Sequence, residues 1–303
     1  MGHSTKNLHQ MITSKKFKII QCTQDEALER GRKYRHRLTK VISKLCENSV
    51  SNNYQHLYVY GPAGIGKTYL VKKQLEESGV KHYLVSGANS IYTLGVFLAV
   101  LQSSNTESEK RYIFIDDCDE ILKSETNCNI MKNVLFGEKK FIYEKSMNSI
   151  LPTLTEVQRS AILSFSSDDK MGFAVPTDNL VFIFTSNFKL PCDDEVQVAR
   201  EKGRSKAVLM AHHNAIRSRV QCADFDLSDA EKWGWSADVI LNTSCLESLN
   251  LTEEERHQIL DFNWNNWERL KERSIRSIEK IAVALRENPE DYMDVWEIDF
   301  LKN

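Results

Sequence analysis

The sequence predicts an α/β domain of three-layer αβα architecture, with a parallel sheet between two layers of helices, followed by a small all-helical domain. Apolar, strand-like runs alternate with helix-like segments between residues 57 and 186, which is typical of a parallel sheet with helical crossovers. Arg111–Asp116 and Leu180–Ser186 are almost continuously apolar, as expected of strands buried on both faces. After Leu227 the strand signal ends and only helical patterns remain.

We expect three regions in the 303 residues. A tail and a basic helix occupy residues 1–50, the α/β domain residues 51–226, and the helical domain residues 227–303. The predicted strands are Phe17–Cys22, Leu57–Tyr60, Val80–Ser86, Arg111–Asp116, Lys140–Tyr143 and Leu180–Ser186. The predicted helices are Gln24–Glu47, Lys67–Ser78, Ile91–Leu101, Asn129–Leu135, Asp229–Val239, Thr252–Glu272, Ser274–Glu287 and Pro289–Phe300. Met147–Thr177 has no clear pattern and is interpreted as an insertion.

The composition narrows the class of protein. Apolar residues make up 41% and charged residues 27% of the chain, so a packed core can form. The net charge of −2 offers no overall basic field for nucleic acid. The 7 cysteines contain no C-x-x-C pair, so neither a disulfide framework nor a zinc site is indicated. Without an apolar signal core in Met1–Lys18, and with no membrane-length apolar window, we expect a cytoplasmic protein with no membrane partner, in the host cytoplasm if it is viral.

One motif indicates phosphate binding. It lies between the predicted strand Leu57–Tyr60 and the helix that begins at Lys67. It fits G-x-x-x-x-G-K-[ST] without a mismatch, over Gly61, Pro62, Ala63, Gly64, Ile65, Gly66, Lys67 and Thr68. The glycines let successive N–H groups point at one anion, and the helix adds its positive end. Lys67 is expected to contact the β- and γ-phosphates, and Thr68 to offer its hydroxyl to Mg²⁺. The motif predicts a P-loop; a glycine-rich turn without a ligand is the alternative.

Polar residues end two of the predicted strands. Asp116 and Asp117 end the strand that begins at Arg111, and Asn187 follows the strand Leu180–Ser186. The carboxyl ends of parallel strands share one edge of a sheet, so Asp116 is expected to hold Mg²⁺ beside the P-loop. Asp117 is where a general base for the attacking water would lie, and Asn187 is a candidate to orient that water. Solvated acids at a strand end, and an asparagine that caps a strand, are the alternatives.

Two arginines, Arg217 and Arg219, lie at the end of a further predicted helix. They form either a solvated helix end or a guanidinium offered to the γ-phosphate of a neighbouring subunit. Two other features also keep more than one interpretation. The basic helix Gln24–Lys44 is either a solvated face, a nucleic-acid contact or a contact with a neighbouring subunit. Tyr92 is either a core residue or part of a pore loop.

In this order the motifs resemble those of the AAA+ ATPase superfamily, from about Asn53 to Lys302. The amino acids within these motifs are similar to those of AAA+ ATPases encoded by tailed bacteriophages. They are also similar to those of clamp-loader and Holliday-junction-motor subunits. The resemblance implies ATP as the nucleotide, a helical lid as the second domain and a ring of subunits. It further implies a role for each matching residue: Walker A for Gly61–Thr68, the Walker B magnesium acid for Asp116, sensor 1 for Asn187, the arginine finger for Arg219 with Arg217 as substitute, and sensor 2 for Arg276.

The chain departs from the family pattern at Asp117, where the family usually has glutamate. Aspartate is one methylene shorter, and a displacement of about 1 Å can lower a rate by orders of magnitude. We therefore expect an ATP hydrolase of reduced rate that remodels or moves a DNA or protein–DNA client as a homo-oligomeric ring. A nucleotide-gated switch or loader that recruits a protein partner is the alternative. A small-molecule kinase would share the P-loop but would not explain Asn187, the arginine pair or the helical domain.

Overall fold

The computed structural model describes residues 22–47, 55–86, 90–104, 110–136, 138–147, 151–166 and 171–302. The described chain divides into two units. The sheet unit consists of the described residues within 37–62 and 67–226, and the helical unit of those within 22–36, 63–66 and 227–302. The predicted strand Phe17–Cys22 lies, except for Cys22, outside the described residues.

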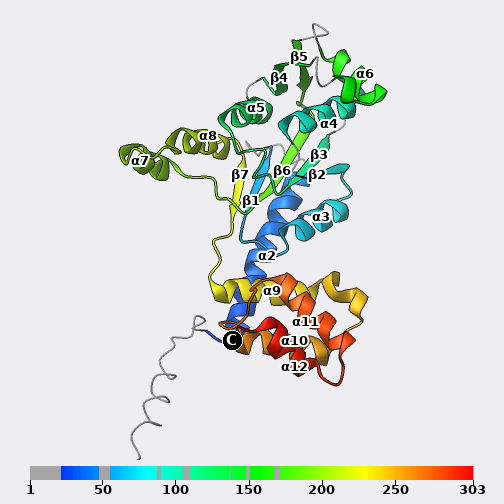
Figure 1. Ribbon diagram of the computed structural model, residues 1–303, viewed down its shortest axis with the longest axis vertical. Coiled ribbons are helices and arrows are strands. Elements are labelled where there is room, and N and C mark those ends of the chain that lie inside the picture. Colours follow the sequence, from blue (N-terminus) through cyan, green and yellow to red (C-terminus); the bar gives the residue numbers. More distant parts are fainter. Residues whose placement is uncertain are drawn as a thin grey trace, which may run out of the picture. The chain divides into compact units, whose positions relative to one another are not determined.

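The sheet unit is built on a five-stranded parallel sheet with the order β2-β3-β6-β1-β7 (Figure 1). Its strands are β1 (Leu57–Tyr60), β2 (His82–Ser86), β3 (Arg111–Asp116), β6 (Leu180–Ser186) and β7 (Gln221–Asp224). The sequence predicted all of them except β7. Because β6 pairs with both β1 and β3, the strand end that leads to Asn187 lies between the P-loop strand and the strand that ends at Asp116.

The sequence did not predict the helices Glu156–Ser164 and Asp193–Glu201. The helices of this unit alternate with its strands along the chain (Figure 1). They are α3 (Lys67–Glu77), α4 (Ile91–Ser103), α5 (Glu125–Leu135), α6 (Glu156–Ser164), α7 (Asp193–Glu201) and α8 (Ala207–Arg217). The helix α5 begins four residues earlier than predicted because Ser124 caps it, accepting a hydrogen bond from the Asn127 N–H. Central strand residues such as Ile113 and Phe182 are fully buried in the core beneath the helices.

The segment between β3 and β6 contains a second, separate sheet of two antiparallel strands, β4 (Lys140–Ser146) and β5 (Met171–Pro176). The predicted strand Lys140–Tyr143 is therefore correct as a strand, but it pairs with an unpredicted strand outside the parallel sheet. The chain between β4 and β5 includes the short 3₁₀ helix η1 (Leu151–Thr153) and α6. Tyr92 packs against Tyr143 and Phe173 of this hairpin, which favours the interpretation of Tyr92 as a core residue.

The helical unit contains α9 (Asp229–Asn242), the 3₁₀ helix η2 (Ser244–Leu249), α10 (Glu253–Asn265), α11 (Ile275–Glu287) and α12 (Tyr292–Phe300). Thr252 and Glu255 form the capping box that the sequence predicted at the start of α10. The core of the unit is rich in tryptophan: Trp233, Trp267 and Trp296 are each at most 3% exposed.

The long helix α2 (Gln24–Cys46) contributes its residues up to His36 to the helical unit, where it crosses α9 at two glycines. A β-carbon on Gly234 would lie 1.7 Å from the Ala27 carbonyl oxygen, and one on Gly31 would lie 2.0 Å from the Gly234 backbone. The two helices can approach this closely only because neither position carries a side chain.

Two of the basic residues of α2 have partners in α9. Asp238 is completely buried, and Arg32 Nε donates to its carboxylate at 3.3 Å. Arg35 Nε donates to the other carboxylate oxygen. These arginines neutralise a buried charge. Arg35 is mostly buried, whereas the Arg32 side chain keeps 50% of its surface exposed.

Within the part of the chain that the structure describes, none of the helices combines the length and apolarity that a bilayer crossing requires.

Candidate nucleotide-binding site

The predicted P-loop leaves β1 at Tyr60 and enters α3 at Lys67. Gly64 has φ +75° and Gly66 φ +81°, in the left-handed region that residues with a β-carbon rarely adopt. The motif therefore has glycine at the positions where the backbone requires it. A bend of this kind turns backbone N–H groups toward a common point, which is the geometry that an anion needs.

Lys67 is the first residue of α3 and only 8% exposed. Its Nζ donates to the carbonyl oxygens of Gly61 at 2.8 Å and Pro62 at 2.9 Å, and to Asn187 Oδ1 at 2.9 Å. The asparagine reaches the ammonium because β6 is the neighbour of β1 in the sheet. Two of the predicted site residues, Lys67 and Asn187, are thus in direct contact.

The two predicted metal ligands are also in contact. Thr68 Oγ1 donates to Asp116 Oδ1 at 2.7 Å. A hydroxyl and a carboxylate are the oxygen ligands that Mg²⁺ prefers, and the ion usually completes its shell with water and phosphate oxygens. This donor set fits Mg²⁺ bound together with a nucleotide. Among the described residues there is no cluster of three or more His, Cys, Asp or Glu side chains suited to a metal.

Asp117 extends this group of polar residues. Its backbone has φ +55°, and its N–H donates to Thr185 Oγ1 at 3.2 Å. Its carboxylate is exposed and lies 3.4 Å from Asn187 Nδ2. The amide of Asn187 is therefore placed between Lys67, from which it accepts, and Asp117, to which it donates. The left-handed backbone of an aspartate costs of the order of 1 kcal/mol, and such strain is concentrated at functional sites.

Sequence reasoning missed Thr185, which connects the two acidic residues. Its side chain donates to Asp116 Oδ1 and accepts from the Asp117 N–H, and the residue is 1% exposed. The next residue, Ser186, donates to the Asp119 carboxylate in the same way. A signal was present, because two hydroxyl side chains stand directly before Asn187 at the end of an otherwise apolar strand.

The two arginines after α8 have different surroundings. Arg217 donates to the Leu190 carbonyl oxygen at 3.0 Å and to Asp224 at 2.7 Å, and the hydrogen bond to Asp224 raises the pKa of the Arg217 guanidinium. Arg219 donates to the carbonyl oxygen of Ala215, and its guanidinium carbon lies 5.9 Å from the centre of the Phe136 ring. Arg217 therefore has an internal role. Within the described chain, no contact is found between Arg219 and the group formed by Lys67, Thr68, Asp116, Asp117 and Asn187.

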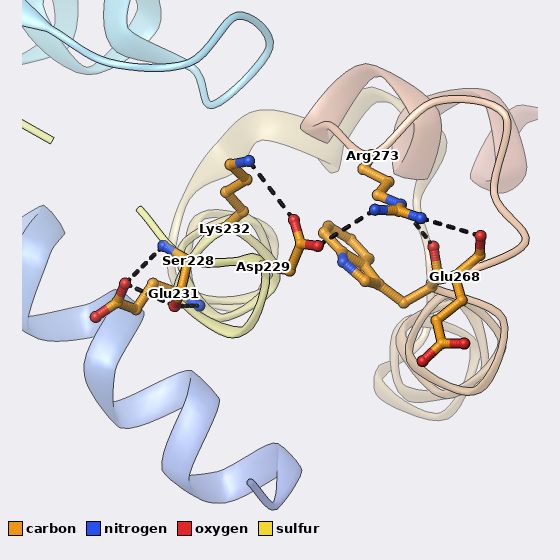
Figure 2. Close-up of polar contacts among 7 residues, drawn as sticks. Ser228, Asp229, Glu231, Lys232, Glu268 and Arg273 are labelled. Atoms are coloured by element: carbon orange, nitrogen blue, oxygen red, sulfur yellow. Dashed lines mark hydrogen bonds and ion pairs between the residues drawn. The ribbon is translucent and has the colours of Figure 1, made fainter. Parts of the chain in front are cut away.

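Arg276 belongs to the helical unit and is exposed in the first turn of α11. Arg273 holds the segment before this helix (Figure 2). Its guanidinium donates to the carbonyl oxygens of Trp267 and Glu268 and pairs with Asp229 at 3.2 Å. These bonds join the α10–α11 connection to the start of α9.

Two further contacts fix the ends of these helices. Lys232 Nζ lies 3.5 Å from the Asp229 carboxylate that Arg273 also contacts, and a Ser228–Glu231 capping box closes the same end of α9 (Figure 2). In the same unit, the Ile275 N–H donates to the Gly64 carbonyl oxygen at 2.8 Å. The first turn of α11, which carries Arg276, is thus hydrogen-bonded to the glycine segment of the P-loop motif.

Comparison with known proteins is consistent with this geometry. Residues 57–201 match the model of the family described as "ATPase family associated with various cellular activities (AAA)". An uncharacterized 36.7 kDa protein from the nrdC-mobD intergenic region of Enterobacteria phage T4 is 25% identical over 239 residues, or 78% of this chain and 65% of that protein. Human ATPase family AAA domain-containing protein 3B is 26% identical over 101 residues, or 32% of this chain and 15% of that protein. The chain thus spans less than two thirds of the length of either relative.

Among solved structures, the RuvB Holliday junction branch migration motor of Thermotoga maritima aligns with a TM-score of 0.45 and 12% identity, over 87% of this chain and 68% of that one. The P-loop, the acidic end of β3 and the family match coincide in residues 57–201. This part of the chain is therefore similar to the AAA family of ATPases, which is the family that the sequence motifs resemble.

Proposed function

We propose that this protein binds ATP with Mg²⁺ and hydrolyses it, and that it uses the cycle to remodel or move a DNA or protein–DNA client as a homo-oligomer. One observation carries the proposal. Lys67 and Thr68 at the start of α3 and Asp116, Asp117 and Asn187 at the ends of β3 and β6 form one hydrogen-bonded group, which Thr185 completes by bonding to both acidic residues. The AAA-family match over the same residues supports ATP as the nucleotide.

Each residue has a role that its contacts support. Lys67 would exchange its bonds to the loop carbonyls for bonds to the β- and γ-phosphate oxygens. Thr68 and Asp116 would hold Mg²⁺, which neutralises charge on the phosphates when bound. Asn187 would orient the attacking water, and Asp117 would accept its proton. The resemblance to the AAA+ superfamily adds Arg276 as a second cationic residue toward the nucleotide.

The oligomeric part of the proposal rests on Arg219. The Arg217 guanidinium is already hydrogen-bonded to the Leu190 carbonyl oxygen and the Asp224 carboxylate. Arg219 is therefore the better candidate for a guanidinium that acts on the γ-phosphate of a neighbouring subunit. Arg219→Ala should lower the rate of ATP hydrolysis by about a thousandfold. Arg204→Ala, at an exposed position before α8, should not change it.

This experiment measures steady-state phosphate release together with the mass of the particle in Mg²⁺–ATP. The proposed ring requires that the wild type assembles, and that inactive Lys67→Ala subunits partly restore activity when mixed with Arg219→Ala subunits. A monomeric wild type, and an Arg219→Ala variant that hydrolyses ATP at the normal rate, would together refute the oligomeric mechanism.

A second candidate, a nucleotide-gated switch or loader with slow hydrolysis, is favoured by Asp117. Its carboxylate is one methylene shorter than glutamate and is drawn toward Asn187. If this short reach limits proton transfer, Asp117→Glu should raise turnover by about tenfold or more. The control Glu120→Asp changes an exposed carboxylate that pairs only with Lys123 among the described residues, and should have no effect. Unchanged turnover in Asp117→Glu would count against the slow-switch account.

Two further parts of the proposal are the client and the cellular location. The similarity to a protein of phage T4 is the support for action in the cytoplasm of an infected host cell. Comparing ATP hydrolysis with no DNA, single-stranded DNA and duplex DNA tests the client class: stimulation by DNA favours a DNA-acting motor, and a flat response favours a protein client.

A further inference from the structure

Ile142 of β4 has outward backbone groups that no hydrogen bond occupies among the described residues. In the β4–β5 hairpin Ile142 lies opposite Ala174, and the Ala174 N–H donates away from β4, to the Phe165 carbonyl oxygen at 3.0 Å. Opposed residues of an antiparallel pair direct their backbone groups either both inward or both outward. The N–H and C=O of Ile142 therefore point away from β5. Pro176, opposite Lys140, has the same outward orientation, which suits a residue that has no N–H to donate.

The two edges of the hairpin differ in how many of their outward backbone groups are hydrogen-bonded. The outer edge of β5 is covered: besides the Ala174 bond, Gly172 O accepts from Ser166 Oγ at 2.7 Å and Pro176 O accepts from Gln102 Nε2 at 2.8 Å. For the outward groups of Ile142, the described residues supply no hydrogen bond. Proteins usually cover or charge an open strand edge, because it is a template for pairing with another chain.

A groove lies along this open edge. A cavity of about 380 Å³ is lined by the four consecutive residues Ile142–Lys145 of β4. The register of β4 against β5 shifts between Tyr143 and Ser146, and this irregularity breaks the alternation of side chains along the lining. The opposite wall is α5, which contributes the amide side chains of Asn127, Asn129 and Asn133 together with Ile130. Within the described chain these three amides make no side-chain hydrogen bond.

We infer that this groove binds an extended segment of a client protein, which pairs with β4 as a third strand. The Ile142 N–H and C=O would pair with the peptide backbone, as in other cases where a peptide extends a sheet. The asparagine amides carry both donors and acceptors, so they suit peptide groups on the other side of the added strand. Ile91, Ile130 and Ile142 offer an apolar surface to alternate peptide side chains.

The charges of the groove favour a peptide over nucleic acid. Of the residues that line it, only Glu144 and Lys145 are charged, and their charges cancel. Nucleic-acid affinity depends on several Lys or Arg side chains that neutralise phosphates, and this groove does not provide them. The inference goes beyond the proposed ATPase activity, because the groove is lined by α4, α5 and β4 without any of the proposed nucleotide-binding residues.

A proline substitution tests the edge directly. Ile142→Pro removes the outward N–H, while the β4–β5 ladder keeps its bonds because Ile142 contributes none to it. Ile142→Val keeps the N–H and is the matched control. A phage-displayed library of random dodecapeptides is selected on the immobilised full chain, and enriched peptides are labelled with fluorescein for titration. We expect peptides to be enriched and Ile142→Pro to weaken their binding by about tenfold or more, with Ile142→Val close to wild type.

The outcomes separate the inference from the proposed function. Both variants should hydrolyse ATP at the wild-type basal rate, whatever that rate is. Failure to enrich peptides, or equal peptide affinity of wild type and Ile142→Pro, would overturn the inference. A labelled single-stranded DNA that binds the wild type and is weakened by Ile142→Pro would also overturn it, in favour of nucleic acid. If circular dichroism shows that Ile142→Pro is unfolded, Asn133→Ala carries the test, since it removes an exposed amide of α5 and should lower peptide affinity.

Discussion

Replacing Lys67 by alanine is expected to abolish measurable ATP hydrolysis. The ammonium is held at the start of α3 by the Gly61 and Pro62 carbonyl oxygens and by Asn187 Oδ1, at 2.8–2.9 Å. In the proposed function the ammonium exchanges the loop carbonyls for phosphate oxygens, and positioned charges of this kind supply much of the stabilisation of a transition state. We expect a loss of about a thousandfold in kcat/KM, which corresponds to roughly 4 kcal/mol.

The matched control is Lys72→Ala. Lys72 lies on the same helix, but its side chain is 56% exposed and lies 3.8 Å from Glu76, one helical turn away. Its removal changes the net charge by the same amount and should leave hydrolysis unchanged. Binding of a fluorescent ATP analogue, measured beside phosphate release, shows whether the loss lies in binding or in chemistry. A Lys67→Ala protein that hydrolyses ATP within about tenfold of wild type would exclude Lys67 as a phosphate ligand.

The buried parts of the fold could be predicted from the sequence. β1, β3 and β6 have the predicted bounds, because strands covered on both faces must be apolar at nearly every position. The sequence did not predict β7 because β7 lies at the edge of the sheet. It is an edge strand whose residues Gln221–Asp224 include one that is fully buried, Ala223, and it is held by backbone pairing with β1. A strand held mainly by main-chain bonds leaves little trace in a hydrophobic pattern.

Several residues of the candidate site could be named from the sequence, but Thr185 and the connections among them could not. A carboxylate or an amide at the end of an apolar strand is visible in the sequence, and so Asp116 and Asn187 could be named. The order β3-β6-β1, which brings Asn187 to Lys67, is a property of the tertiary structure. The choice between Arg217 and Arg219 also required the structure, because the partner that holds Arg217 is Asp224, at the end of the strand that the sequence did not indicate.

Thr185→Val should impair hydrolysis although Thr185 is not itself a candidate ligand of nucleotide or metal. Valine has nearly the same shape, so the buried site stays filled, but the hydroxyl that donates to Asp116 and accepts from the Asp117 N–H is lost. A buried polar group left without its partner costs about 1–3 kcal/mol. The same hydroxyl sets the positions of both carboxylates, so we expect kcat to fall by roughly one to two orders of magnitude and more Mg²⁺ to be needed for half-maximal activity.

Thr185→Ser separates this positioning role from simple packing, because serine keeps the hydroxyl and loses only a methyl group. Hydrolysis titrated with Mg²⁺, together with the thermal midpoint of unfolding, should show Thr185→Ser close to wild type in both kcat and Mg²⁺ requirement. If Thr185→Val and Thr185→Ser have equal kcat and equal Mg²⁺ dependence, the hydroxyl does not position the acids, and differences in stability alone would reflect packing. If only the valine variant loses activity, the end of β6 acts in the site through two residues, with Asn187 facing Lys67 and Thr185 holding Asp116 and Asp117 in register.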